Sequence, residues 1–213
     1  MKEHINKVCQ MAYWELRRIS SIRQYLTEDA AKTLVVSLVL SRLDYGNCLI
    51  AGVPECLLQK LKKKKRKKEK KKKKSQNASA RLILKFSRQE HTKPLLRSLH
   101  WLPISDRIKY KLSCMCYNSV TASTPQYLAD LLQIYTPSRT LRSTADTRKP
   151  KIPPFKKKYS SQRYFSHQGP VAWNNLPFSI RHTQTYSSFK SQLKTHLFSQ
   201  TFQWNLVFAA LCI

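Results

Sequence analysis

A run of thirteen consecutive residues, 62–74, limits what this chain can fold into more than any other feature. It contains twelve basic side chains and one acid, Glu69, and therefore carries a net charge of +11. Because like charges repel and none of these side chains can be buried, we expect residues 62–76 to form a disordered, low-complexity insert. The whole chain carries +29, so the other 200 residues still hold +18.

The rest of the composition is typical of a folded protein. Hydrophobic residues make up 41% of the chain and include four Trp, ten Tyr and eight Phe, which is too apolar for a wholly disordered protein. The length of 213 residues leaves room for one domain or two small ones. Only three glycines occur, so the Gly-rich phosphate loops of nucleotide-binding folds are excluded.

Six cysteines are scattered along the chain with no signal peptide ahead of them. This pattern is typical of reduced thiols inside a cell, and the protein is not expected to be secreted. Residues 33–40 and the apolar tail are both far shorter than the roughly twenty residues that cross a bilayer, so we expect no membrane contact. The basic run favours a nuclear location over a cytoplasmic one.

Apolar residues at helical spacing predict a mainly α fold. They recur over residues 3–20, which we expect to form an amphipathic helix. Thr27 can cap a second helix, with Glu28 and Asp29 in the first turn, where the helix dipole favours acids. Residues 34–43 of this helix are apolar nearly all round, so it should lie at the centre of the core.

Short helices separated by prolines are expected after the basic run. Helical patterns begin near residues 78 and 105, after Pro125 and at Phe189. Residues 173–180 are predicted to be a turn-rich connection. His100 and Trp101 could stack on a base, but the leucines and isoleucine around them favour core packing over that role.

Three motifs carry a resemblance to a known family: SRLDY at 41–45, HWLP at 100–103 and WNNLP at 173–177. Together and in this order they resemble the C-terminal part of the reverse transcriptase polyprotein of LINE-type, non-LTR retrotransposons. The resemblance covers most of residues 5–200. In that family this region follows the polymerase palm, which implies a small, helical, thumb-like bundle that grips template and primer, followed by an extension.

Helical spacing, composition and the resemblance together predict a mainly α chain of six segments. The insert is expected to interrupt a small thumb-like bundle. A Pro-rich basic linker, expected to be extended and mobile, then leads to short C-terminal helices and an apolar tail. The segments are thumb-like helices at 1–61, the insert at 62–76, thumb-like and post-thumb helices at 77–134, the linker at 135–161, a C-terminal helical segment at 162–200 and the tail at 201–213.

The residues that catalysis would need are missing. Polymerases of this kind hold two Mg²⁺ ions with clustered carboxylates, usually including an Asp pair. This chain has no Asp-Asp pair, and its eleven acids are dispersed. We therefore expect no enzyme activity, no catalytic residue, no cofactor and no small-molecule substrate.

A zinc site at Cys114 and Cys116, with His91 and His100 upstream, is conceivable. However, the gap of one residue is not the usual spacing of two to four, and on a helix the two thiols would point to different faces. We expect buried or idle thiols and no metal.

The function predicted from these features is nonspecific binding of RNA or DNA through phosphate contacts. The candidate residues are the basic side chains of the run, of the helix that follows it and of the linker. They are Lys62, Lys63, Lys64, Lys65, Arg66, Lys67, Lys68, Lys70, Lys71, Lys72, Lys73, Lys74, Arg81, Lys85, Arg88, Lys156, Lys157 and Lys158.

Two alternatives stay open. The chain could be a protein-interaction or scaffold fragment that binds another chain through the apolar helix at 34–43 and the C-terminal helix. It could also be a translated pseudogene with no selected function.

Deleting residues 62–74 should raise the melting temperature if the run only interrupts a helix. The deletion removes both the repulsion between like charges and the entropy cost of closing a long loop. Thermal unfolding of the deletion and of the full chain measures this, and a lower melting temperature in the deletion would contradict the prediction.

Overall fold

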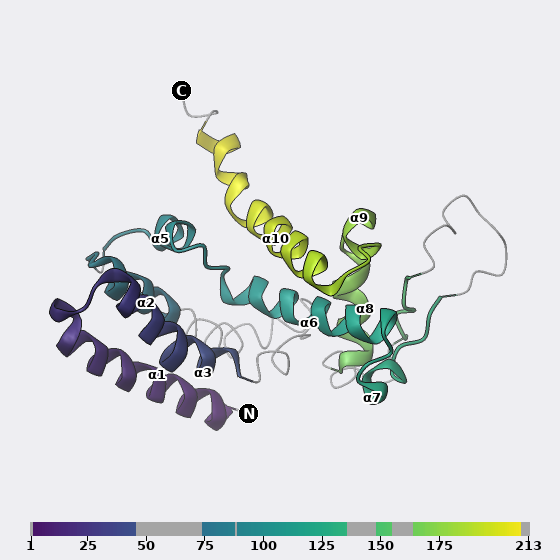
Figure 1. Cartoon of the computed structure of the whole chain (residues 1–213), viewed down its shortest axis with the longest axis horizontal. Helices are drawn as coiled ribbons and strands as arrows, with labels where there is room; N and C mark the ends of the chain where they lie inside the picture. The colour runs from purple at the N-terminus through teal and green to yellow at the C-terminus, as the bar shows by residue number, and fades with distance from the viewer. Residues whose placement is uncertain (1, 46–73, 88, 136–147, 155–163, 210–213) are drawn as a thin grey trace. The chain divides into compact units, whose positions relative to one another are not determined.

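The computed structural model describes residues 2–45, 74–87, 89–135, 148–154 and 164–209 (Figure 1). This part of the chain is mainly helical and contains no strand, which confirms the predicted fold class. The chain divides into two compact units. Unit 1 covers Met1–Asn47 and Glu55–Arg107, and unit 2 covers Cys48–Pro54 and Ile108–Ile213. None of the described helices is long and apolar enough to span a membrane.

Unit 1 begins with a long amphipathic helix, as its apolar spacing predicts. Helix α1 spans Lys2–Ile22, and the short turn η1 at Arg23–Tyr25 follows it. Val8, Ala12 and Ile19 fall on one face of α1 and are buried, which is the pattern of a helix that packs against a core on one side.

The second helix of unit 1 is continuous through three segments: α2 (Glu28–Val35), the π-helical turn η2 (Val36–Leu40) and α3 (Ser41–Asp44). The Thr27 hydroxyl accepts a hydrogen bond from the Ala30 N–H at 3.3 Å, so the predicted cap is confirmed. Val35, Val39 and Leu43 are fully buried, and this helix lies alongside α1 (Figure 1). The predicted central place of residues 34–43 is therefore confirmed.

Residues 74–84 form a further helical stretch whose first residues belong to the predicted insert. Gln76 is fully buried, and its side-chain amide donates to the Leu102 carbonyl at 2.9 Å. The insert prediction is therefore wrong for residues 74–76, because all three are helical and Ser75 and Gln76 are buried. Residues 62–73 lie outside the described residues.

The end of this stretch is held by the chain that follows α1. The Arg23 guanidinium donates to the Leu82 and Ile83 carbonyls, at 3.0 and 2.5 Å. Carbonyls in the last turn of a helix have no partner within the helix, and a cation there also interacts favourably with the helix dipole. Arg23 therefore links the C-terminal ends of two helices that are distant in sequence.

Two helix ends in unit 1 use a residue other than glycine in the left-handed conformation. Lys85 has φ 55°, and the next N–H donates to Arg81 O at 3.1 Å. His100 ends helix α5 (Thr92–Ser98) with φ 53°, and the Trp101 N–H donates to Leu96 O at 2.8 Å. Both are Schellman-type ends, where glycine is the usual choice.

The HWLP motif is thus a helix end that leads into the core. Leu99, Leu102 and Ile104 are buried, and Trp101 is half-buried, in agreement with the packing prediction. That prediction is wrong for His100, whose side chain is exposed. His100 itself forms the left-handed turn, and the chain enters the core only at the residues that follow it.

Unit 2 is built around aromatic side chains. Its helices are α6 (Ile104–Thr121, of which Ile108 onward belongs to this unit), α7 (Gln126–Ala129), α8 (Phe165–Asn174), α9 (Phe178–Arg181) and α10 (Tyr186–Ala209). Tyr117 stacks on Phe189 with ring centroids 4.4 Å apart, and Trp173 lies 5.6 Å from Phe189. Trp173 and Phe189 are fully buried.

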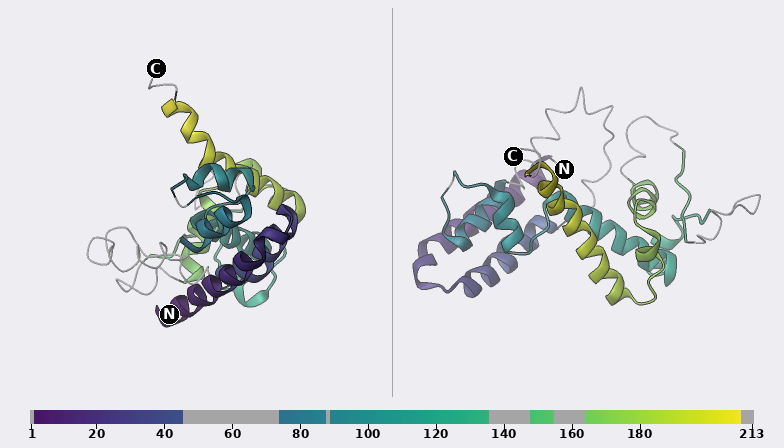
Figure 2. Two further views of the ribbon diagram at one scale, coloured as in Figure 1. Left: turned by 90° about the vertical axis from the view of Figure 1, so that its left-hand side faces the viewer. Right: turned by 90° about the horizontal axis from the view of Figure 1, so that it is seen from above.

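The C-terminal helix agrees with its predicted spacing. Phe189, Leu193 and Leu197 of α10 are buried, and α9 packs against this helix (Figure 2). The prediction for residues 173–180 is only partly right, because α8 runs to Asn174 and α9 begins at Phe178. The turn is restricted to the residues between these helices.

The WNNLP motif fixes part of the predicted linker. The Trp173 indole N–H donates to Arg148 O at 2.6 Å, and the Asn174 amide donates to Pro150 O at 3.1 Å. Pro150 is buried and forms an isolated bridge with Ile134. The linker prediction is therefore wrong for residues 148–150, which are held by side chains of α8, while 136–147 and 155–161 lie outside the described residues.

Helices α6 and α8 approach closely where Gly169 faces Cys116. A Cβ atom added at Gly169 would lie 2.7 Å from the Cys116 sulfur, and the ring of Phe165 would be 3.1 Å away. Burial also raises the pKa of the Cys116 thiol well above its ordinary value, which keeps it neutral.

The substitution Gly169→Ala should destabilise the protein. Because the contact at 2.7 Å is shorter than Cβ atoms normally make, we expect an overpacking cost in the upper part of the usual range, about 2–3 kcal/mol, which exceeds the roughly 1 kcal/mol that alanine gains over glycine in a helix. We expect a net loss of about 1–2 kcal/mol in the free energy of unfolding, measured by denaturant titration. In the double variant Gly169→Ala/Cys116→Ala the loss should be smaller than the sum of the two single losses, and strict additivity would contradict the packing account.

Candidate nucleic-acid interface

Three of the predicted binding residues are described, and they share one side of a helix. Lys74 and Arg81 are seven residues apart, which places them on one stripe of the helical stretch 74–84, and Lys85 follows at its C-terminal turn. The buried residues Gln76 and Ile83 belong to the opposite stripe. Sequence and packing therefore agree that this stripe is turned away from the core of unit 1.

The three side chains are not equivalent. Lys74 and Lys85 are exposed, whereas Arg81 is half-buried and donates to the Glu90 carbonyl at 2.8 Å. Arg81 thus helps to hold the connection between the stretch 74–84 and α5. The rest of the predicted binding residues, namely residues 62–73, Arg88 and Lys156 to Lys158, lie outside the described residues.

A groove with a volume of about 530 Å³ lies between one flank of α1 and Lys74. Four of its residues recur at steps of four, three and four along α1, so they form a single stripe of that helix. The groove is lined by Asn6, Cys9, Gln10, Tyr13, Trp14, Arg17 and Lys74. We define these seven residues as the α1 groove.

The α1 groove combines aromatic and cationic side chains. Tyr13 and Trp14 are 39% and 57% exposed, although large aromatic rings are usually mostly buried. Arg17 and Lys74 are exposed as well. Aromatic rings beside cations are the combination that single-stranded nucleic acids bind, through base stacking and phosphate contacts.

The groove residues of α1 are not among the predicted binding residues, because the strongest signal in this helix is its apolar face. Lys74 was predicted only as the last residue of the basic run. The polar stripe of Asn6, Gln10, Tyr13 and Arg17 has a helical period that was available in the sequence. What was not available is that Lys74 lies across from it.

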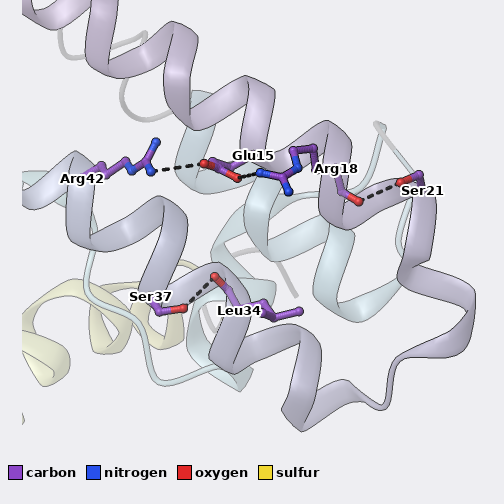
Figure 3. A network of polar contacts seen from close by, with 6 residues as sticks. All are labelled: Glu15, Arg18, Ser21, Leu34, Ser37 and Arg42. Atoms are coloured by element: carbon purple, nitrogen blue, oxygen red, sulfur yellow. Dashed lines mark hydrogen bonds and ion pairs between the residues drawn. The ribbon is translucent and has the colours of Figure 1, made fainter.

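Arg18, which lies over the Trp14 ring, belongs to a network of charged side chains with Glu15 and Arg42 (Figure 3 shows Arg18, Glu15 and Arg42). The guanidinium carbon of Arg18 lies 4.7 Å from the centroid of the Trp14 ring, within the range of a cation–π contact. Arg18 also lies 3.5 Å from a carboxylate oxygen of Glu15, and Arg42 of α3 lies 3.2 Å from the other oxygen. Because the Glu15 side chain is only 5% exposed, this carboxylate depends on its two arginines.

The charged residues of the SRLDY motif serve the fold rather than the interface. Arg42 pairs with Glu15 across α3 and α1, and Asp44 pairs with Arg107 at the start of α6. Burial lowers the pKa of Arg107, while the charge of Asp44 and its hydrogen bond act in the opposite direction. These cations are already matched to acids inside unit 1.

The two neighbouring thiols of α6 face different surroundings, as their spacing predicts. Cys116 packs against Gly169 of α8, whereas Cys114 is hydrogen-bonded with Tyr110 and Tyr186. Burial raises the pKa of Cys114, and it raises the pKa of Tyr110 to about 12. Among the described residues no group of three or more His, Cys, Asp or Glu side chains could hold a metal ion.

Comparison with known proteins does not assign a family to this chain. No protein-family model matches it, and no match was found among the curated proteins or the solved structures. The residues themselves and their geometry are therefore the basis for inferring a function.

Replacing Arg42 with Met should destabilise the protein, because it leaves the buried Glu15 carboxylate with one partner only. Removing one partner of a buried pair costs several kcal/mol, and we expect about 2 kcal/mol here because Arg42 is 37% exposed and Arg18 remains. Denaturant unfolding measures the loss.

Two controls make this prediction specific. Arg18→Met removes a cation that is 63% exposed and should cost less than about 1 kcal/mol. The double variant Glu15→Gln/Arg42→Met removes the buried charge together with its partner and should be more stable than Arg42→Met alone. An equal or greater loss in the double variant would contradict a dependence of Glu15 on Arg42.

Proposed function

We propose that this chain is a non-catalytic fragment of a non-LTR retrotransposon reverse transcriptase that binds nucleic acid nonspecifically through its phosphates. One observation carries the proposal. The basic stripe of residues 74–85 is turned away from the core, and its first residue, Lys74, borders a groove that already contains Arg17 and exposed aromatic rings.

The distribution of charge within unit 1 supports this proposal. The buried acid Glu15 and the partly buried Asp44 are matched by Arg18, Arg42 and Arg107. By contrast, Arg17, Lys74 and Lys85 have exposed side chains. With a net charge of +29 on the whole chain, such a surface attracts a polyanion, and binding gains from the counterions that the phosphates release.

The motifs that carry the resemblance also have structural roles. Arg42 and Asp44 of SRLDY join helices of unit 1, and Leu102 of HWLP is buried and accepts a hydrogen bond from Gln76. Trp173 of WNNLP fixes Arg148 in unit 2. These roles give each of the three motifs a place in the packing of its own unit.

The protein-interaction alternative is less well supported. Residues 34–43 were its proposed binding helix, but Val35, Val39 and Leu43 are fully buried against the rest of unit 1. The apolar residues of α10 at Phe189 and Leu193 are fully buried as well. These buried side chains are not available for a second chain, and of the segment 34–43 only Val36 is an exposed large apolar residue, whereas the cations named above are exposed. A nuclear location, proposed from the basic run, would bring the chain to nucleic acid.

Affinity for an RNA–DNA duplex, measured over a salt series, tests the proposal. We expect the deletion of residues 62–73, which keeps Lys74, to bind with a shallower salt slope than the full chain. In the full chain, Arg17→Gln/Lys74→Gln should reduce the slope of log K against log salt by about 1.4–1.8, since each phosphate contact contributes about 0.7–0.9.

Lys151→Gln/Lys194→Gln is the matched control, because it removes two exposed lysines of unit 2 and changes the net charge equally. This control should change the slope less than the groove pair does. If the deletion abolishes binding, or if the two pairs of substitutions have the same effect, the folded surface of unit 1 is not the binding site.

A further inference from the structure

We propose that the α1 groove binds an unpaired base of a single-stranded nucleic acid, with the base stacked on the Trp14 ring and its neighbouring phosphates at Arg17 and Lys74. This inference rests on the proposed function and adds the class of substrate, namely a single strand rather than a duplex.

The first step is the exposure of the aromatic rings. Burying a ring the size of Trp14 would stabilise the fold, yet 57% of it is exposed, and Tyr13 beside it is 39% exposed. Both rings border the same hollow. What distinguishes these two rings is that they border the groove together with Arg17 and Lys74, which places ring faces beside cations.

The second step is that the Trp14 ring is held before any ligand arrives. The Arg18 guanidinium carbon lies 4.7 Å from the centroid of the ring. Arg18 in turn pairs with the buried Glu15 carboxylate, as Figure 3 shows. Glu15 is itself held by Arg42 from the neighbouring helix. The guanidinium covers one side of the indole, and the ring also lines the groove. A base that enters the groove would therefore stack on a ring whose orientation is already fixed, so binding would not bear the entropy cost of ordering it.

The third step concerns the size and the polar lining of the groove. Its volume of about 530 Å³ lies within the range of about 300–1,000 Å³ that is typical of small-ligand pockets. The amide of Gln10 can both donate and accept hydrogen bonds, so it can bond to the edge of a base. Arg17, four residues or about one turn beyond Tyr13 on the same stripe, and Lys74 supply positive charge for the phosphates of the strand.

The preference for a single strand follows from access to the base. Within a duplex each base is stacked on both sides, and extracting one costs a few kcal/mol. In a single strand the face of the base is available, and stacking on an aromatic ring is worth about 1–3 kcal/mol for every type of base. A duplex would therefore reach the cations of the groove but not the Trp14 ring.

The test measures the binding of the full chain to three probes: a short mixed-sequence DNA single strand, an abasic strand of the same length, and a duplex. We expect Trp14→Ala to weaken binding to the normal strand by about 10-fold, the equivalent of roughly 1.4 kcal/mol of stacking. Binding to the abasic strand and to the duplex should be unchanged. Trp14→Phe keeps a ring and should keep most of the affinity.

Tyr25→Ala is the matched control, because this aromatic residue is 81% exposed and lies on η1, outside the groove. It should not change binding to any probe. If Trp14→Ala weakens the normal and the abasic strand equally, or weakens neither, the stacking inference is overturned while phosphate binding stands. If the unmodified chain binds none of the three probes, both the inference and the proposed function fail.

Discussion

The buried carboxylate of Glu15 is the interaction on which unit 1 depends. Its two oxygens pair with arginines from two helices, Arg18 on α1 and Arg42 on α3, so that one acid links the helices and orients the Trp14 ring. Loss of Arg42, the less exposed of the two partners, is expected to be the more costly, because it leaves the buried carboxylate with only the exposed Arg18. In a chain with 40 basic and 11 acidic residues, each buried acid determines where several cations can be placed.

This placement separates two classes of basic residue. Arg23, Arg42 and Arg107 act inside the fold, where they bind backbone carbonyls or carboxylates. Arg17 and Lys74 instead lie at the α1 groove with exposed side chains. Net charge alone does not distinguish these roles, since both classes contribute equally to the total. The proposed interface therefore rests on burial and geometry, with the overall charge supplying long-range attraction.

Local features of the fold were predictable where one helix contained the whole signal. The spacing of apolar residues located α1 and α10, and Thr27 with its two following acids located the start of α2. Contacts between distant segments were not predictable. Nothing local to the sequence indicates that Trp173 holds Arg148 or that Gln76 is buried against Leu102, because each contact depends on how separate segments pack.

The sequence by itself determined that this chain is mainly helical, strongly basic and without an Asp-Asp pair, because composition and helical period are properties of the chain order alone. Only the tertiary structure decided that His100 is exposed, that residues 148–150 are held in place and that Lys74 faces the polar stripe of α1. A groove between residues about sixty positions apart exists only after packing has brought them together. Helical period can be recognised from neighbouring residues, whereas the packing of distant side chains leaves no periodic pattern in the sequence.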